Sequence, residues 1–181
     1  MGRLFVISGS SGVGKGTVIN EFMHRHPEFK LSVSCTTRGK REGEQDGVNY
    51  FYLSQEEFKK CIENNEFLEW AEFSGNFYGT KKEFVEKCLS SGENLILEID
   101  TKGALNVKKI MPEATLIFIA PPSLEELEAR LRGRHTETEE AIQKRLASIK
   151  SEIENSKHYD FVVVNDTVEN AVIKIEKIVE G

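Results

Sequence analysis

A glycine-rich stretch near the N-terminus has the composition and spacing of a phosphate-binding loop. Residues 9–15 read Gly-Ser-Ser-Gly-Val-Gly-Lys, which fits the pattern GxxxxGK. Glycines let the backbone turn tightly, so that successive N–H groups can converge on an anion where a helix begins. Lys15 adds a flexible charge that can follow the β- and γ-phosphate oxygens of a nucleoside triphosphate. An ordinary strand-to-helix turn is the alternative, and the glycines, the lysine and their context together argue against it.

The residues on either side of this loop supply the context that the motif requires. The apolar run Leu4–Ile7 precedes it and predicts a buried strand. After the loop, Val18, Ile19, Phe22 and Met23 recur at helical spacing and predict an amphipathic helix. The order strand, glycine loop and helix is the arrangement in which such loops bind phosphate.

One residue departs from the general pattern of these loops. Gly16 follows Lys15 where serine or threonine is usual, and Thr17 comes next. The hydroxyl that usually contacts magnesium has therefore moved, or the metal is held mainly by phosphates and water. The sequence GKGT is similar to the loop of nucleoside monophosphate kinases.

Two arginines and two tyrosines further along the chain could bind a phosphate dianion. Arg38 and Arg41 lie three residues apart in a polar stretch, and two guanidinium groups can bind one phosphate from several sides. Tyr50 and Tyr78 offer phenolic hydroxyls in a β-like region. Taken alone, the arginine pair reads first as an exposed charge cluster. For the tyrosines, ordinary sheet packing is an equal alternative.

Three carboxylates are further candidates for ligand binding. Glu98 and Asp100 lie two residues apart at the end of a predicted strand, hence on one side of it. Ligand sites form at the carboxyl ends of parallel strands. Glu69, by contrast, reads from its neighbours alone as an outward-facing strand residue beside Trp70.

The elements that must position these residues alternate between strand and helix, which predicts an α/β fold. Continuous apolar runs indicate strands buried on both faces of a parallel sheet; these runs are Leu4–Ile7, Leu95–Ile99, Leu116–Ala120 and Phe161–Val164. Pairs at capping-box spacing predict helix starts; the pairs are Ser54 with Glu57, Thr80 with Glu83, and Ser123 with Glu126. Gly92 suits the end of the helix that Thr80 would begin.

Two regions read as insertions into this α/β core. The segments 49–53, 67–73 and 76–78 are aromatic and β-like, and residues 74–76 are a turn signal. They predict a small antiparallel sheet. Residues 123–151 are highly charged and follow two helical patterns, for which a solvated surface is the plain explanation.

Length and charge limit the classes of protein that this chain can belong to. It has 181 residues, of which 39% are hydrophobic and 30% charged, as in a globular protein. The formal net charge of −6 argues against a broad nucleic-acid surface. No apolar run approaches the roughly 20 residues of a membrane span. Three widely spaced cysteines suggest neither disulfides nor a zinc site, so we expect a cytoplasmic protein. Nothing in the sequence indicates an oligomeric state.

Seven blocks of the sequence, taken together, resemble the guanylate kinase family. In the family's order and spacing, they are SGSSGVGKGT, SVSCTTRGKREGEQDGVNYFY, EFLEWAEFSGNFYGT, LILEID, IFIAPPS, GRHTETEEAIQKRL and VVND. The resemblance implies a P-loop parallel sheet core covered by helices, a GMP-binding insert and a helical lid. The core would comprise residues 1–32, 84–122 and 152–181, the insert residues 33–83 and the lid residues 123–151.

The resemblance also implies a set of site residues. ATP would be bound by Gly9, Ser10, Ser11, Gly12, Val13, Gly14, Lys15, Gly16 and Thr17, with Asn165 and Asp166 near the adenine. GMP would be bound by Ser34, Arg38, Arg41, Glu44, Tyr50, Glu69, Tyr78, Thr80 and Asp100. The phosphate would lie against the arginines and tyrosines, with Glu44 supporting them. Ser34, Glu69, Thr80 and Asp100 would read the base.

The chemistry of guanine agrees with these assignments. Guanine presents an N–H and an amino group side by side, and the carboxylate of Glu69 can accept from both. Its O6 needs a donor, such as the hydroxyl of Ser34. Adenine reverses the polarity at this position, and sites built in this way can discriminate by roughly 10⁴–10⁵. Glu98 stands where the family usually has aspartate, which leaves its role open.

The implied reaction is ATP + GMP → ADP + GDP, with dGMP as a further acceptor. The attacking phosphate oxygen already carries charge, so no general base is needed, and charge is cancelled by Lys15, Arg38, Arg134, Arg145 and Mg²⁺. Magnesium would be held through phosphates and water, with Thr17 or Glu98 as candidate contacts. The alternatives are a catalytically silent binding module of the same fold, a kinase for another monophosphate and, more remotely, a nucleic-acid-binding ATPase.

Overall fold

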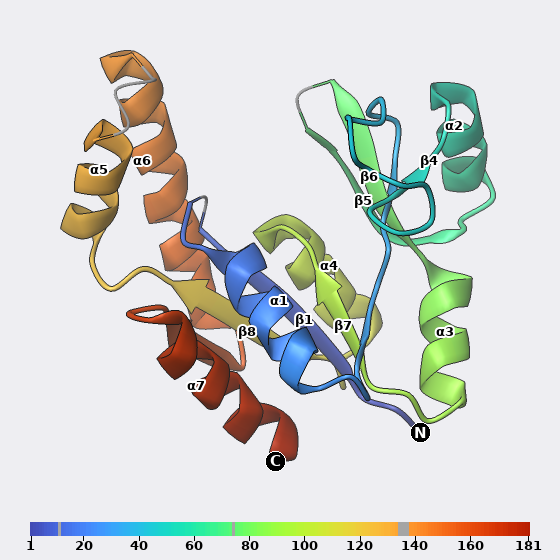
Figure 1. Ribbon diagram of the computed structural model, residues 1–181. Helices are drawn as coiled ribbons and strands as arrows, with labels where there is room; N and C mark the ends of the chain where they lie inside the picture. Colours follow the sequence, from blue (N-terminus) through green and yellow to red (C-terminus); the bar gives the residue numbers. More distant parts are fainter. Residues whose placement is uncertain (11, 74, 134–137) are drawn as a thin grey trace. The chain divides into compact units, whose positions relative to one another are not determined.

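The computed structural model describes residues 1–10, 12–73, 75–133 and 138–181, in which strands and helices alternate along the chain (Figure 1). In chain order the elements are β1 (Leu4–Gly9), α1 (Lys15–Arg25), β2 (Lys30–Leu31), β3 (Cys35–Thr36), β4 (Phe51–Tyr52), α2 (Gln55–Glu63), β5 (Phe67–Phe73), β6 (Asn76–Lys81), α3 (Lys82–Ser90), β7 (Leu95–Glu98), α4 (Thr101–Ile110), β8 (Thr115–Ala120), α5 (Leu124–Gly133), α6 (Glu139–Asn155), the 3₁₀ turn η1 (Ser156–His158), β9 (Phe161–Val164) and α7 (Val168–Glu180).

A five-stranded sheet contains all four apolar runs that were predicted to be strands. Its strand order is β2-β7-β1-β8-β9, and both β2 with β7 and β8 with β9 are parallel. The non-consecutive order requires crossover connections, and helices follow β1, β7, β8 and β9 along the chain. The predicted α/β fold class is therefore confirmed.

The prediction that Phe161–Val164 is buried on both faces is wrong. Phe161, Val162 and Val164 are exposed, and Val163 is the buried residue of this strand. The reason is position: β9 is the last strand of the sheet, so it has a neighbouring strand on one side only. An apolar run predicts a strand but does not distinguish a central strand from an edge strand.

A second sheet has the strand order β4-β3-β6-β5. The pair β5–β6 is antiparallel, as predicted. The strand β3 was not predicted; it pairs antiparallel with β6 but parallel with β4, so the sheet is mixed. The strand predicted over residues 49–53 shrinks to Phe51–Tyr52. Just before it the chain turns: Gly47 N–H donates to the carbonyl of Tyr50 at 2.8 Å, and Asn49 N–H to that of Gln45 at 3.1 Å. These backbone groups therefore form hydrogen bonds within a loop and not between strands.

The three predicted helix starts have different outcomes. Ser54 and Glu57 form a reciprocal capping box at the start of α2. At the start of α5, the hydroxyl of Ser123 accepts from Glu126 N–H at 3.0 Å. The box at Thr80 is wrong: Thr80 lies in β6, Lys81 occupies the cap position of α3, and the Thr80 hydroxyl donates to Glu69 instead.

The predicted end of α3 is confirmed. Gly92, with φ +85°, follows the last turn of the helix. Its N–H donates to the carbonyl of Leu89 at 3.1 Å, and Glu93 N–H donates to that of Cys88 at 3.0 Å. Glycine is favoured here because the left-handed backbone disfavours a side chain.

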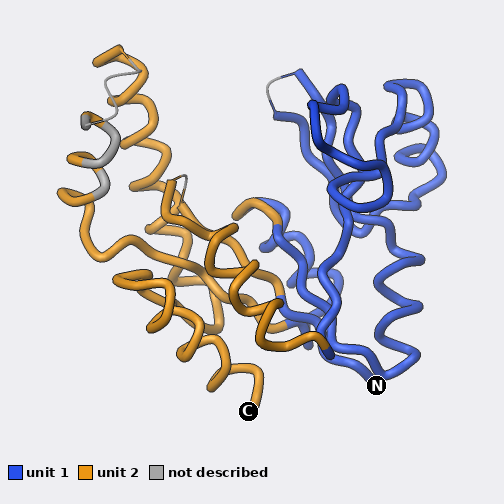
Figure 2. Tube along the Cα trace, viewed as in Figure 1, with its two compact units in different colours: residues 1–5, 28–98, 102–114 blue, residues 6–27, 99–101, 115–181 orange. Residues whose placement is uncertain are grey.

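The chain forms two compact units (Figure 2): residues 1–5, 28–98 and 102–114 form unit 1, and residues 6–27, 99–101 and 115–181 form unit 2. In unit 1, α2 covers one face of the four-stranded sheet, with Phe58 buried against Cys35 and Phe67. In unit 2, α1 packs beside α7. The helices α5 and α6 share a cluster around Ile142, Leu146 and Ile149. In the described ranges, no helix is both long enough and apolar enough to cross a membrane.

Candidate functional site

The glycine loop connects β1 to α1 within unit 2, as the motif predicts. Gly12 and Gly14 have φ +79° and +87°, in the left-handed region that favours glycine. Gly9 is constrained differently: a Cβ atom there would lie 2.7 Å from the carbonyl oxygen of Ile119. The three glycines thus serve the tight turn and the close backbone approach expected of this loop.

The loop leads directly into a helix N-terminus that can receive an anion. Lys15, half-buried, is the first residue of α1, and Thr17 is exposed in the same turn. This turn holds no acidic residue, so the positive end of the helix dipole is not neutralised locally. Ser10 is 3% exposed, and its hydroxyl has no hydrogen-bond partner among the described residues. Ser11 lies outside the described residues.

Asn165 lies against this loop and contacts Val13, although 152 positions separate the two residues in the sequence. The side-chain amide of Asn165 donates to the carbonyl of Val13 at 2.7 Å, and both residues are buried. The backbone N–H of Asn165 donates to the carbonyl of Ala120 at 2.9 Å, just beyond the β8–β9 pair. Sequence reasoning placed Asn165 near the adenine and did not predict a contact with the loop itself.

Asp166, which was paired with Asn165 in the prediction, takes part in the first turn of α7. Its carboxylate accepts from Thr167 N–H at 2.8 Å and from the Asn170 amide at 3.2 Å. These two bonds lower the pKa of Asp166. Lys174 lies 3.8 Å from the same carboxylate.

The predicted lid arginines are only partly described. Arg145 lies on α6 and is half-buried, whereas Arg134 lies outside the described residues. Elsewhere in the predicted lid, the charge run is partly paired within itself: Arg132 forms ion pairs with Glu128 and Glu139. The plain explanation of charged residues on a solvated surface therefore fits Arg132.

In unit 1, Arg38 and Glu44 form the centre of the cluster predicted to bind a monophosphate. Arg38 donates to Glu44 Oε1 and to the carbonyl of Gly39, both at 2.8 Å. Arg41 N–H donates to Glu44 Oε2 at 2.8 Å, while the Arg41 side chain is exposed. Hydrogen bonding to Glu44 raises the pKa of Arg38, so this guanidinium stays charged.

Three tyrosines surround this pair, one more than the sequence predicted. The rings of Tyr50 and Tyr78 lie 6.1 Å apart, and the Arg38 guanidinium lies 5.3 Å from the Tyr50 ring centre. The hydroxyl of Tyr52 donates to Glu44 Oε2 at 2.7 Å. Tyr52 was missed because it was counted only as part of an aromatic strand. Its separation from Tyr50 by two residues, which places both rings on one side, was the available signal.

Acid should weaken the fold through Glu44. Hydrogen bonds from Arg38, Arg41 N–H and Tyr52 lower its pKa from 4.5 to about 2, so the unfolded chain binds a proton more readily. The stability from ionised Glu44 is present above pH 4.5 and is lost as the pH falls toward about 2. In urea unfolding, the stability difference between the wild type and Glu44→Gln should therefore shrink across this window. The exposed Glu42→Gln is the control, and a pH-independent difference for Glu44→Gln would contradict the prediction.

Glu69 and Thr80 form a buried polar pair elsewhere in unit 1. The register pairs them across β5 and β6, and a bulge between Phe67 and Glu69 shifts the pairing by one residue. Glu69 is 8% exposed, whereas Trp70 is 45% exposed, so the outward-facing reading of Glu69 is wrong. The Thr80 hydroxyl donates to Glu69 Oε1 at 2.8 Å. Because a carboxylate has two acceptor oxygens, buried Glu69 can also accept hydrogen bonds from a ligand that offers paired N–H donors.

The remaining predicted residues lie at loop and strand ends. Ser34 is half-buried, and its carbonyl accepts from Phe51 N–H at 2.9 Å. Glu98 and Asp100 are exposed around the buried Ile99, which agrees with their placement on one side of the strand. The described ranges contain no cluster of three or more histidine, cysteine or acidic side chains that could hold a metal ion.

Comparisons with known proteins agree with these features. A family profile described as guanylate kinase matches residues 1–181. A guanylate kinase of Bacillus cereus is 54% identical over 181 residues, covering 99% of this chain and 88% of that protein. One from Synechococcus is 51% identical over 175 residues, with coverages of 97% and 92%. The crystal structure of guanylate kinase from Anaplasma phagocytophilum aligns with a TM-score of 0.80 at 33% identity, covering 99% of this chain and 85% of that one.

The match therefore extends over the whole chain, and its relatives share about half of its residues over nearly their full length. From its glycine loop to its final helix, this chain belongs to the guanylate kinase family.

Proposed function

We propose that this protein transfers the γ-phosphoryl group of ATP to GMP, giving ADP and GDP. Membership of the guanylate kinase family supports the reaction, and the glycine motif in the loop between β1 and α1 supports binding of the triphosphate there. The observation that carries the choice of GMP is the buried carboxylate of Glu69, with Thr80 bonded to one of its oxygens. Guanine can donate two hydrogen bonds to such a group, whereas adenine at the same edge cannot.

Catalysis in this proposal depends on alignment and on cancellation of charge. The attacking oxygen of GMP is already anionic, so a general base is not required. Lys15 would follow the transferred group, and Arg38 would hold the acceptor phosphate. Arg134 and Arg145 would add positive charge when the proposed lid closes, which also excludes water from the reaction.

A divalent metal would bind to this site together with ATP. Mg²⁺ would be held mainly through the phosphates of the nucleotide and through water. The exposed hydroxyl of Thr17 in the first turn of α1, or the carboxylate of Glu98, would contact the metal or its water. When bound, Mg²⁺ would neutralise charge on the β- and γ-phosphates.

We also propose the arrangement of functional regions within the chain. Residues 33–83 would form the GMP-binding region, since they contain the four-stranded sheet and the clusters around Glu44 and Glu69. Residues 123–151, which include α5 and most of α6, would form the lid. Residues 1–32, 84–122 and 152–181 would form the core. A reducing cytoplasm fits the three free cysteines.

A coupled assay of ADP release tests the proposed function. Purified protein with ATP and Mg²⁺ would be offered GMP, dGMP, AMP, CMP and UMP in separate reactions. We expect GMP to be the best acceptor, followed by dGMP. A faster reaction with AMP, CMP or UMP would overturn the guanine assignment. Absence of turnover with all five would favour a catalytically silent module of the same fold.

Tyr52→Phe should weaken GMP binding without changing use of ATP. The variant keeps the ring but removes the 2.7 Å hydrogen bond to Glu44, which orients Arg38. Loss of one such bond corresponds to about 1–2 kcal/mol, so we expect the KM for GMP to rise roughly five- to thirtyfold. Steady-state kinetics with each substrate varied in turn measures the effect. An equal change in the KM for ATP would contradict it.

A further inference from the structure

The hydrogen bond between Asn165 and the glycine loop has a consequence for phosphate binding. We propose that Asn165 is a positioning residue: it fixes the peptide between Val13 and Gly14 in the orientation that receives the phosphates of the donor nucleotide. The inference rests on the proposed function, because it concerns how the ATP site is shaped. It differs from an adenine contact, which would act on the base alone.

The argument begins with the geometry of one peptide. A trans peptide is planar, so its carbonyl and its N–H point in opposite directions. The Val13 carbonyl accepts from Asn165 Nδ2 at 2.7 Å. The N–H of Gly14 must therefore point away from Asn165. By bonding to the Val13 carbonyl, Asn165 fixes the direction of the Gly14 N–H.

Without that bond the peptide would have considerable freedom. Gly14 has φ +87° and no side chain, so the peptide before it can rotate at little steric cost. A rotated peptide would present a carbonyl oxygen where an N–H had been, and the oxygen would repel a phosphate. An exposed donor could not suppress this motion well, but Asn165 is 8% exposed and shielded from competing water.

The amide also limits which residue can occupy the loop. A Cβ atom on Gly14 would lie 3.0 Å from Asn165 Nδ2, the one close contact found for it among the described residues. The side chain of Asn165 therefore packs directly against the backbone that it orients. Glycine at position 14 and asparagine at position 165 fit each other as a pair.

Asn165 can act in this way because its own position is fixed on both sides. On the strand side, its backbone N–H bonds to Ala120. On the helix side, α7 begins with Thr167 as its cap, whose hydroxyl accepts from Asn170 N–H at 3.2 Å. Asn165 therefore lies between β9 and α7, and hydrogen bonds fix the backbone on both sides of it.

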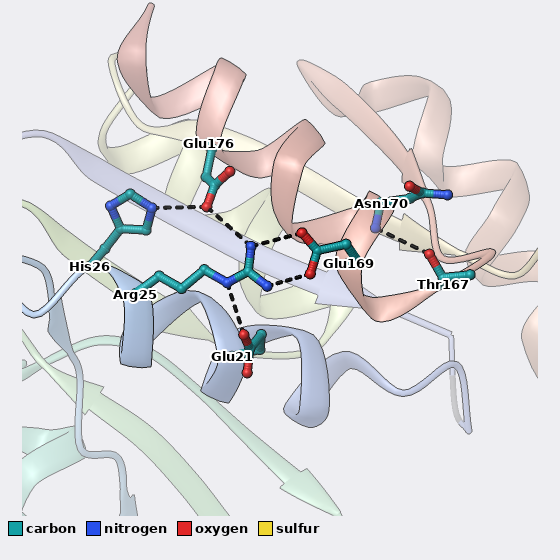
Figure 3. A network of polar contacts seen from close by, with 7 residues as sticks. All are labelled: Glu21, Arg25, His26, Thr167, Glu169, Asn170 and Glu176. Carbon is teal, nitrogen blue, oxygen red and sulfur yellow. Dashed lines mark hydrogen bonds and ion pairs between the residues drawn. The ribbon is translucent and has the colours of Figure 1, made fainter.

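A second set of contacts ties α7 to α1, the helix that the loop begins (Figure 3). The Arg25 guanidinium, at the end of α1, binds Glu169 through both of its terminal nitrogens and Glu21 through Nε at 2.8 Å. His26 lies 3.2 Å from Glu176 on α7. The far end of α1 is thus joined to α7 from its first turn onward, so that the Asn165–Val13 bond spans segments that other contacts already hold together.

Binding of inorganic tripolyphosphate tests the inference, because this ligand has phosphates but no base. Affinities for tripolyphosphate and for ATP would be measured by calorimetry for the wild type, Asn165→Ala and Asn165→Asp. We expect Asn165→Ala to weaken both ligands by a similar factor of about ten or more. Asn165→Asp, which replaces the donor by an anionic acceptor of the same size, should weaken both further. The affinity for GMP should not change.

Three controls keep the result interpretable. Asn20→Ala removes an exposed amide from α1 and should bind both ligands normally. Asn165→Ser is a milder variant if the others fold poorly. In the wild type, the Gly14 amide resonance should shift strongly on addition of tripolyphosphate, a readout that needs no substitution.

Several outcomes would overturn the inference. Variants that lose affinity for ATP but keep it for tripolyphosphate would show that Asn165 acts on the adenine alone. An unshifted Gly14 resonance would show that this N–H does not face the phosphates. A wild-type protein that binds neither ligand would overturn this inference and the proposed function together, whereas a wild type that turns over GMP beside variants of normal affinity would overturn the inference only.

Discussion

Replacing Lys15 with methionine should lower kcat by about 10²- to 10³-fold while leaving the protein folded. Methionine has a similar length and apolar stem but no charge, so it removes the one cation that the glycine motif itself supplies. Lys15 is the first residue of α1, next to loop glycines in left-handed conformations. A charge in this place is most useful when negative charge moves between donor and acceptor, which is why kcat should fall more than ATP affinity.

Rapid-quench measurement of GDP formation at saturating ATP and GMP would give the effect on the transfer step. Lys59→Met, at an exposed position of α2, is the matched control and should retain wild-type turnover. Circular dichroism would establish that both variants are folded. Near-normal turnover of folded Lys15→Met would contradict the proposed mechanism.

Glu69→Gln should lower kcat/KM for GMP by about 10²- to 10³-fold and should not lower kcat/KM for AMP, which we expect to be a poor acceptor. Glutamine keeps the shape of the side chain, but one oxygen becomes an amino group. The Thr80 hydroxyl, which donates to Glu69 Oε1 at 2.8 Å, would hold the remaining oxygen and turn the amino group toward the ligand. A donor would then face the donors of guanine in a buried site, where hydrogen bonds cannot be exchanged for water.

The substrate panel with GMP and AMP, run on the variant, measures this effect. Glu72→Gln, on the same strand but exposed, should have no influence. If Glu69→Gln and Glu72→Gln gave the same small change, the buried carboxylate would not be the guanine reader.

The sequence was most informative where a local pattern is enough to determine structure. Continuous apolar runs identified four strands of the larger sheet, and glycine spacing located the loop between β1 and α1. The capping box at Ser54 was also predictable, since all of its atoms lie within one turn. In each case the residues that interact are neighbours in the sequence.

The failures involve residues that interact although they are not neighbours in the sequence. The predicted cap at Thr80 was wrong because its hydroxyl is used across the strand pair by Glu69, which no local pattern reveals. The two-residue spacing of Tyr50 and Tyr52 could have placed both rings on one side, but it could not predict the hydrogen bond from Tyr52 to Glu44 across a loop. The contact of Asn165 with Val13 joins distant parts of the chain. Pairings of this kind depend on the register of strands and on the tertiary structure, so spacing alone could not predict them.

The division of the chain into units has a consequence for synthesis on the ribosome. Unit 2 takes its pieces from both ends of the polypeptide, residues 6–27 and 115–181, with most of unit 1 translated between them. The glycine loop is translated early. Asn165, whose side-chain amide bonds to Val13 in this loop, follows β9 and is translated 152 residues later. A nascent chain therefore cannot form the Asn165–Val13 hydrogen bond until residue 165 has been translated, and a product truncated before Asn165 would lack this bond altogether.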